Sequence, residues 1–179
     1  MNVAICDYGA GNTRSVEIAF ARLGARFTDD AANADLTVLP GVGSARSAMN
    51  GLRKRGLDEA LRERVDQSRA VLGICLGLQL ALDESEEDGG VEGLGIVPGR
   101  LVRLREGRVP RIGWAHVDGL NETFYFAHSY AAETPCATAH SENVVAVVER
   151  GAFTGVQFHP EKSGAAGARF LESLCLSLV

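Results

Sequence analysis

Cys75 is the residue of this sequence that is best placed to react, because it lies between an apolar run typical of a strand and an apolar run with helical spacing. Residues 71–74 are typical of a short buried strand, and the residues after the cysteine have helical spacing. Gly73 and Gly77 flank the join and lack the Cβ atoms that a tight strand-to-helix turn excludes. A thiol in such a turn lies beside a helix N-terminus, which favours the reactive thiolate. We therefore predict that Cys75 is a nucleophile and that the backbone N–H of Leu76 faces a developing oxyanion.

The other three cysteines have no comparable context. Cys6 ends an apolar N-terminal run, Cys136 follows a proline in a loop, and Cys175 lies on the apolar face of a helix. Unpaired cysteines are usually small buried apolar side chains, and we expect that role for these three. The sequence contains no C-x-x-C pair, so it favours a reduced cytosolic protein without a disulfide framework or a metal site.

A base and an acid for such a thiol occur together near the C-terminus, in the segment GVQFHPEKS at residues 155–163. Pro160 ends the predicted strand, so His159 and Glu161 lie at its carboxyl end. A histidine can take the proton of a thiol, and a carboxylate can hold the imidazole in the correct tautomer and stabilise its charged form. We predict that His159 and Glu161 complete a catalytic triad with Cys75.

The elements that must position this triad alternate between strands and helices in the first half of the chain, which indicates a parallel sheet. Asn12 is suited to cap the first of the helices. The predicted elements are strands at 2–6, 35–39 and 71–74 and helices at 12–24, 44–52, 57–65 and 76–84.

Two glycine-rich loops follow predicted strands. In an open α/β sheet the loops at the carboxyl ends of the strands converge on one crevice, so the loop PGVG at residues 40–43 should lie near Cys75. Its backbone N–H groups, that of Gly43 included, are candidates for an oxyanion hole. The loop at residues 9–11 superficially has a dinucleotide-binding pattern, but the third glycine is absent, so we favour a simple turn there.

The second half of the chain has short β-like runs separated by turns, so the sheet should be mixed. We expect a solvated loop without identifiable chemistry at the acidic, glycine-rich residues 83–95, and a last helix from Gly164 whose apolar stripe docks on the sheet. The predicted strands of this half are residues 96–99, 100–104, 111–117, 123–130, 144–149 and 153–158.

Composition sets the broad class of the protein. With 179 residues, 46% of them hydrophobic, residues 1–179 are expected to form one domain with a substantial core. A net charge of -5 leaves no basic surplus for phosphate groups, which argues against nucleic-acid binding. The start MNVAIC has no basic segment, and no apolar run has the length of a signal sequence or a membrane span, so we expect a cytoplasmic protein.

Taken together, the motifs resemble those of class I (triad) glutamine amidotransferases, whose G-x-C-x-G-x-Q and H-P-E appear here as GICLGLQ and HPE. Within that class, the chain resembles the glutaminase subunit of imidazole glycerol phosphate synthase. The features that carry this likeness are the PGVG loop, the opening D-Y-G-x-G-N, G-W at 113–114, Y-F-x-H-S-Y at 125–130 and the extended F-H-P-E-K-S. The resemblance implies a single α/β domain with a central mixed, mostly parallel sheet flanked by helices.

The same resemblance implies an activity. Cys75 would form a thioester with the side chain of L-glutamine, ammonia would leave with a proton from His159, and water would release glutamate. A separate cyclase subunit, bound as a heterodimer, would use the ammonia to convert a ribulosyl-carboxamide nucleotide into imidazole glycerol phosphate and an aminoimidazole carboxamide ribotide. No cofactor is implied.

The resemblance also implies roles for eight further residues at positions that match the family motifs. These are Gln79, Ser129 and Tyr130 for binding glutamine, Leu76 and Gly43 for the oxyanion hole, and Asn12, Trp114 and Lys162 for the interface with the cyclase.

Two departures from the family pattern stand out. Ala115 and His116 follow Trp114 where the family usually has Asn, and the region 131–155 is shorter than usual, so its strands are expected to be trimmed. Two alternatives stay open: a glutaminase subunit of another ammonia-channelling synthase, such as an aminodeoxychorismate or vitamin B6 system, and a non-catalytic regulatory protein on the same fold. The PGVG loop argues against the first, and the complete triad argues against the second.

Overall fold

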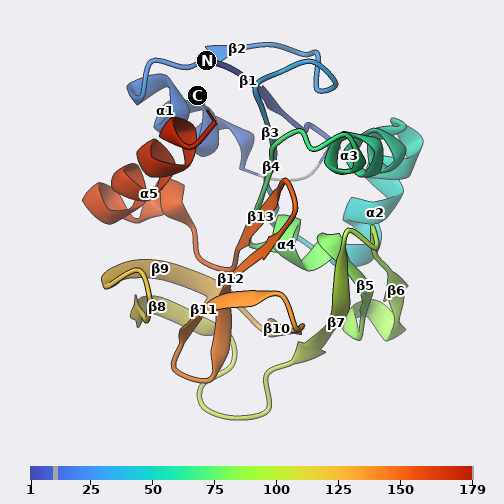
Figure 1. Ribbon diagram of the computed structural model, residues 1–179. Coiled ribbons are helices and arrows are strands. Elements are labelled where there is room, and N and C mark those ends of the chain that lie inside the picture. The colour runs from blue at the N-terminus through green and yellow to red at the C-terminus, as the bar shows by residue number, and fades with distance from the viewer. Residues whose placement is uncertain (10–11, 179) are drawn as a thin grey trace.

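The computed structural model describes residues 1–9 and 12–178 and has a central seven-stranded sheet with helices on both faces (Figure 1). The strand order is β11-β12-β13-β4-β3-β1-β2. These strands are β1 (Asn2–Ile5), β2 (Arg26–Phe27), β3 (Leu36–Leu39), β4 (Val71–Ile74), β11 (Ala137–Ser141), β12 (Val144–Arg150) and β13 (Phe153–Val156).

Most of this sheet is parallel. Strands β2, β1, β3, β4 and β13 all pair in parallel, whereas β12 and β11 join at one edge in antiparallel pairs. The central strands β3 and β4 are buried at every position, because helices cover both faces, and this explains their continuous apolar sequences LTVL and VLGI. The prediction of an α/β fold with a mixed, mostly parallel sheet is confirmed.

The helices bury one apolar core on each face of the sheet. Val16 and Phe20 of α1 share a core with Leu171 of α5, whereas Met49 of α2 and Leu61 of α3 belong to the core on the other face. Figure 1 shows the two pairs of helices on opposite sides of the sheet. The helices are α1 (Thr13–Arg22), α2 (Ala45–Lys54), α3 (Leu57–Asp66), the short α4 (Leu76–Ala81) and α5 (Gly164–Leu176).

Two smaller sheets extend the molecule below the carboxyl ends of the central strands in Figure 1. One is four-stranded, in the order β10-β7-β5-β6, and the other is the antiparallel hairpin of β8 and β9. Their strands are β5 (Leu82–Ser85), β6 (Val91–Glu92), β7 (Val97–Arg103), β8 (Arg111–Val117), β9 (Glu122–His128) and β10 (Tyr130–Glu133).

Several of the secondary-structure elements predicted from the sequence were wrong. The segment 83–95 is not a solvated loop, because it contains β5, the 3₁₀ turn η1 (Glu87–Gly89) and β6, and it buries Val91 and Leu94. For the same reason the helix after Cys75 does not reach Glu84: the chain becomes extended at Leu82, which pairs with β7.

The remaining differences concern strands of the second half and one short strand of the first. The runs 96–99 and 100–104 belong largely to the single strand β7, and the run 123–130 is divided between β9 and β10. Strands β2 and β11 have no predicted counterpart. Within 131–155 the structure places most of β10, all of β11 and β12, and the start of β13.

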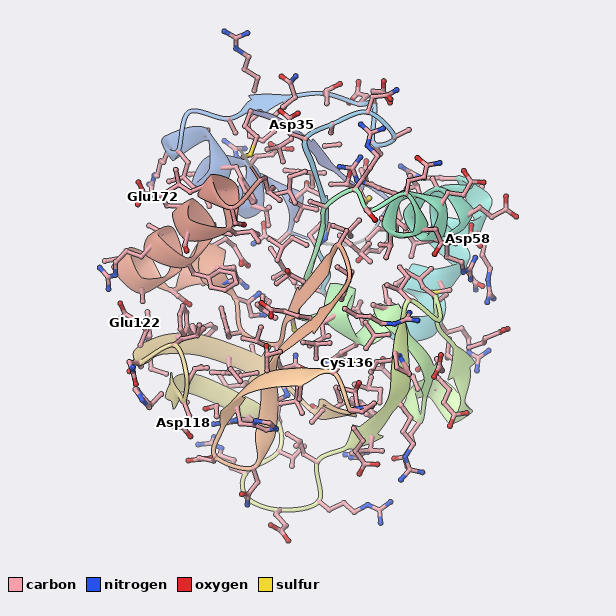
Figure 2. The ribbon with its side chains drawn as sticks, viewed as in Figure 1. Asp35, Asp58, Asp118, Glu122, Cys136 and Glu172 are labelled. Atoms are coloured by element: carbon pink, nitrogen blue, oxygen red, sulfur yellow. The ribbon has the colours of Figure 1, made fainter. Side chains whose placement is uncertain are left out.

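The outer surface is polar on the helices that flank the sheet. Figure 2 shows Glu172 of α5 on the outside of the molecule, whereas Asp58 at the start of α3 pairs with Arg62 and its side chain is only 14% exposed. The structure contains no helix, among the residues it describes, that is long and apolar enough to cross a membrane. The glycine turn predicted at residues 9–11 lies in part outside the described residues, which exclude 10 and 11.

Candidate active site

The active-site candidates meet because three neighbouring strands are parallel and end together. The register pairs Leu39 of β3 with Gly73 of β4, and Ile74 of β4 with Val156 of β13. The chain therefore leaves all three strands at the same edge of the sheet, where the PGVG loop, Cys75 and the segment leading to His159 follow.

Cys75 occupies a strained turn between β4 and α4. Its backbone has φ +53° and ψ −104°, a region that non-glycine residues rarely adopt. A Cβ on Gly77 would overlap the Leu39 carbonyl, and a Cβ on Gly73 would lie 2.8 Å from the backbone carbon of Gly77. The two glycines therefore allow the close approach that the sequence pattern predicts, and the Cys75 side chain is left at the strand end with only 6% of the residue exposed.

His159 and Glu161 lie beside this cysteine. The Nδ1 atom of His159 is 2.9 Å from Oε1 of Glu161, and both side chains are 3% exposed. Burial acts to lower the pKa of His159, but hydrogen bonding and charge from Cys75 and Glu161 outweigh it and raise this pKa to about 9. The structure thus brings the three predicted triad residues together, and the imidazole holds a proton at neutral pH.

The PGVG loop packs directly against the turn that holds Cys75. A Cβ on Gly41 would lie 2.5 Å from Cβ of Leu76, so the loop approaches α4 as closely as it does because residue 41 is glycine. Gly43 has φ +111°, again a glycine conformation, with open space where a Cβ would be. Leu76 is the first residue of α4, so both predicted oxyanion-hole residues lie next to the thiol.

A cavity of about 260 Å³ opens in front of Cys75, and all three predicted substrate-binding residues line it. Sequence reasoning missed two further polar residues in its wall, Glu87 and His128. Glu87 was hidden in a segment read as a solvated loop, whereas His128 belongs to the H-S-Y motif but was assigned no role. The residues that line the cavity are Val42, Gly43, Cys75, Gln79, Glu87, Pro110, Ile112, Ala127, His128, Ser129 and Tyr130.

Burial shifts the pKa values of the two missed residues in opposite directions. Burial raises the pKa of Glu87, although its Oε2 accepts a 2.8 Å hydrogen bond from the Ala45 N–H. Burial lowers the pKa of His128 to about 4, so its ring is neutral at pH 7. Its Nδ1 donates to the Tyr130 carbonyl at 2.8 Å, which leaves Nε2 without a hydrogen atom and without a partner among the described residues.

A third missed residue, Gln157, contacts the sulfur itself. Its Nε2 lies 3.5 Å from Sγ of Cys75, and its Oε1 accepts a 3.0 Å hydrogen bond from Nε2 of Gln79. Gln157 is fully buried. The signal in the sequence was a single polar residue inside the apolar run GVQF, two positions before His159.

The three residues predicted for a partner interface lie around the same end of the sheet. Trp114 is 59% exposed on β8, next to Tyr125 of β9, whose backbone carbonyl accepts from the His159 N–H. Lys162 is exposed in the 3₁₀ turn η2 (Pro160–Lys162). Asn12 caps α1 by accepting from the Ser15 N–H, as predicted, and lines a small recess together with His159 and Glu161.

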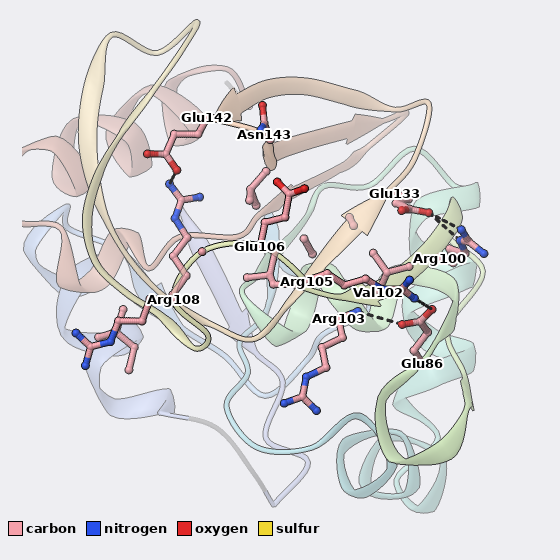
Figure 3. Close-up of a pocket in the computed structure, with 17 residues that line it drawn as sticks. Glu86, Arg100, Val102, Arg103, Arg105, Glu106, Arg108, Glu133, Glu142 and Asn143 are labelled. Carbon is pink, nitrogen blue, oxygen red and sulfur yellow. Dashed lines mark hydrogen bonds and ion pairs between the residues drawn. The ribbon is translucent and has the colours of Figure 1, made fainter.

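A larger hollow of about 730 Å³ lies beside the cavity in front of Cys75 and shares Ile112 with it (Figure 3). Arginine and glutamate side chains line it, and several of these are paired: Arg100 with Glu133 at 2.8 Å and Arg111 with Glu142 at 3.2 Å. None of the triad lines this hollow. Within residues 1–9 and 12–178, no group of three or more His, Cys, Asp or Glu residues is arranged to hold a metal ion.

Comparison with known proteins agrees with this geometry. The family model described as glutamine amidotransferase class-I matches residues 4–177. The imidazole glycerol phosphate synthase subunit HisH of Chlorobaculum tepidum is 42% identical over 200 residues, covering 96% of this chain and 98% of that protein. HisH of Symbiobacterium thermophilum is 44% identical over 192 residues, with 94% of this chain and 91% of that protein covered.

Two further comparisons extend this picture. The chloroplastic imidazole glycerol phosphate synthase hisHF of Arabidopsis thaliana is 40% identical over 197 residues, which span 94% of this chain and 33% of that protein. A crystal structure of a glutamine amidotransferase shares the fold, with a TM-score of 0.80 at 20% identity over 98% of this chain and 97% of that one. The chain therefore belongs to the class I glutamine amidotransferases, in the family of the HisH subunits of imidazole glycerol phosphate synthase.

Proposed function

We propose that residues 1–179 form a glutaminase that hydrolyses L-glutamine for an imidazole glycerol phosphate synthase. The observation that carries the proposal is the buried 2.9 Å pair of His159 and Glu161 beside the strained turn of Cys75. The relatives named HisH, which are 42% and 44% identical over nearly their full length, favour this synthase over other ammonia-channelling systems.

The first half of the reaction forms a thioester. The thiolate of Cys75 attacks the side-chain amide carbon of glutamine, and the carbonyl oxygen becomes an oxyanion. When this intermediate collapses, the C–N bond breaks, and His159 gives its proton to the leaving nitrogen, which departs as ammonia. The raised pKa of His159 supplies this proton at neutral pH, and Glu161 stabilises the imidazolium until it is given up.

The second half regenerates the thiolate. Neutral His159 takes a proton from a water molecule, whose oxygen attacks the thioester carbon. The C–S bond then breaks, glutamate leaves, and the sulfur departs as the thiolate beside the newly protonated imidazole. In both halves, the N–H of Leu76 and an N–H of the PGVG loop near Gly43 donate to the oxyanion.

The cavity in front of Cys75 provides contacts for the rest of the substrate. The amide nitrogen of Gln79 is committed to Gln157 and to the Tyr130 carbonyl, so its Oε1 is the atom that can accept from glutamine. Glu87 contributes a carboxylate to the cavity wall, which suits the α-ammonium group. Ser129 and Tyr130 lie on the same wall and complete the binding site for the amino-acid part.

The ammonia is passed to a cyclase on another chain. We place the contact at the face that carries Asn12, Trp114 and Lys162, because this face adjoins the triad and exposes an indole ring. The exposed Ile112 extends its apolar area on β8. The two chains would act as a heterodimer in the cytoplasm, where the cyclase forms imidazole glycerol phosphate and an aminoimidazole carboxamide ribotide without a cofactor on this subunit.

The test combines the protein with a cyclase subunit and the ribulosyl-carboxamide nucleotide. Glutamate and imidazole glycerol phosphate should form in equal amounts from glutamine. With Cys75→Ser, glutamate formation should fall to background, while added ammonium salt should still support imidazole glycerol phosphate formation. If glutamate forms but imidazole glycerol phosphate does not, the protein is a glutaminase but this synthase is not its partner.

A further inference from the structure

The side chain of Gln157 contacts both Cys75 of the triad and Gln79 of the substrate cavity. It follows β13, precedes His159 by two residues, and has no exposed surface. Its backbone N–H donates to the Ala146 carbonyl at 2.9 Å, which holds the residue against β12. The side chain therefore enters the site from a fixed point of the central sheet, with its amide between Cys75 and Gln79.

One backbone carbonyl fixes the orientation of both side-chain amides. The carbonyl of Tyr130 can only accept, so the end of Gln79 that faces it at 3.3 Å must be the NH₂ group. The same NH₂ group faces Gln157 at 3.0 Å, so Gln157 must present its oxygen there. The nitrogen of Gln157 is consequently the atom that lies 3.5 Å from Sγ of Cys75.

An N–H group aimed at sulfur affects the protonation of the thiol. A hydrogen bond to the charged form of a group favours that form, so a donor at Sγ stabilises the thiolate. Besides His159, which interacts with the sulfur through hydrogen bonding and charge, the sulfur contacts the Ala127 carbonyl at 3.9 Å, which can only accept and so favours the thiol. Gln157 is therefore a donor that acts on the sulfur without carrying charge.

We propose that Gln157 is a further catalytic residue, which stabilises the Cys75 thiolate by hydrogen bonding and holds the Gln79 carbonyl towards the substrate. The proposal rests on the glutaminase activity inferred above. Gln157 thereby couples the ionisation of the Cys75 thiol to the orientation of Gln79 in the substrate cavity. Its NH₂ group donates to the sulfur, and its oxygen accepts from Gln79 and keeps that side chain in its binding orientation. Loss of this amide should affect both.

The test measures the protonation of Cys75 without glutamine and without a partner. The alkylation rate of Cys75 by iodoacetamide is followed from pH 5 to pH 10 by mass spectrometry of the Cys75 peptide. The midpoint of this profile should rise by about one pH unit in Gln157→Met, which removes the donor at similar size, so that alkylation at lower pH slows roughly tenfold. It should rise further in Gln157→Glu, where a carboxylate faces the sulfur.

Matched variants separate this role from simple packing. Gln67→Glu makes the same chemical change at an exposed position that directly follows α3 and should leave the midpoint unchanged. Gln79→Ala should raise the KM for glutamine and, since Gln79 holds the oxygen of Gln157 away from the sulfur, should raise the midpoint no further than Gln157→Met does. The variants leave in place the other titratable groups around the sulfur, which are Tyr8, Glu87, His128, His159 and Glu161.

The outcomes distinguish this proposal from the proposed function. A midpoint in Gln157→Met and Gln157→Glu equal to that of the wild type would overturn the role of Gln157, whatever the glutaminase activity. A raised midpoint in a protein that never hydrolyses glutamine would support the contact and refute the proposed reaction. If Gln157→Met does not fold, Gln157→Glu, which keeps the shape of glutamine, decides the outcome alone.

Discussion

The hydroxyl of Tyr8 donates a 2.6 Å hydrogen bond to the carbonyl of Pro40, across 32 positions of sequence. Tyr8 follows β1, and Pro40 opens the PGVG loop after β3, so the bond joins the loops of two neighbouring strands. The same hydroxyl would lie 3.0 Å from a Cβ on Gly41, which shows how tightly the loop is held at its start. The PGVG loop is thus fixed at Pro40 and less constrained at Gly43.

We expect Tyr8→Phe to lower the free energy of unfolding by about 1–3 kcal/mol, because the buried Pro40 carbonyl loses its donor while the ring still fills its place. Urea unfolding measures the change. Tyr125→Phe is the control, since the structure shows no hydrogen bond of this hydroxyl within residues 1–9 and 12–178. An equal loss of unfolding free energy in both variants would mean that the hydrogen bond of Tyr8 does not contribute to stability.

The reactivity of the four cysteines should differ sharply. A glutamine analogue with an electrophilic group should label Cys75, which lines the proposed substrate cavity, and spare the other three. Burial raises the pKa of Cys6 to about 12 and also raises that of Cys175, so neither thiol forms a thiolate readily. Mass spectrometry of the labelled peptides identifies the site. Labelling of Cys136 before Cys75 would refute the assignment of the nucleophile.

That Cys75, His159 and Glu161 lie together could be predicted from the sequence, because each belongs to a short motif with its own local signal: glycines around Cys75, and a proline between His159 and Glu161. Gln157 and Glu87 could not. Their roles depend on contacts between segments far apart in the chain, such as the 78 positions between Gln79 and Gln157, and no local period reports such contacts.

The fold, too, could be predicted only where the sequence carries a local signal. Continuous apolar runs identified the buried strands β3 and β4, whereas β5 and β6 were missed because their sequences LDES and VE are acidic. These strands form by pairing with each other and with β7, and that pairing outweighs their weak intrinsic preference for extended structure. Tertiary context, not local sequence, therefore decides the segment that carries Glu87.

The raised pKa of His159 predicts how stability depends on pH. The pKa rises from 6.5 to about 9 on folding, so the folded protein holds this proton more tightly than the unfolded chain. The resulting stabilisation is fully present below pH 6.5 and is lost as the pH rises through about 9. The difference in unfolding free energy between wild type and His159→Gln should therefore shrink over this range. Urea unfolding at several pH values measures it, and a constant difference would contradict the raised pKa.

Charge reversal at Lys162 should weaken the complex with the cyclase. Lys162 is exposed one residue after Glu161, so Lys162→Glu leaves the core intact but changes the charge of the proposed interface. Titration of labelled cyclase measures the dissociation constant, and thermal unfolding checks the fold. Lys54→Glu reverses an exposed charge at the end of α2 and serves as the control. Equal affinity in wild type and Lys162→Glu would remove this residue from the interface.

The conformation of Gly43 should control the activity of the subunit. In the proposed mechanism, one oxyanion donor is the Leu76 N–H and the second belongs to the PGVG loop. The peptide of this loop at Gly43 can reorient at little steric cost, because glycine tolerates φ +111°. We expect slow glutamate formation by the protein alone, faster formation with the cyclase, and the fastest with cyclase and nucleotide, if the partner favours the N–H-inward orientation. Equal rates in all three conditions would show that the oxyanion hole is already formed.

Gly43→Val tests this loop directly. Nothing lies within 4 Å of the added Cβ, so the substitution acts through the backbone, by penalising the positive φ. Loss of one oxyanion donor typically costs on the order of 10²–10³ in kcat, and we expect a loss of this size in the assembled enzyme. Gly24→Ala places a side chain at φ +77°, also in open space, after α1 and away from the PGVG loop. If the two variants lose the same activity, general backbone strain and not the oxyanion hole explains the effect, and Gly43 has no role in the switch.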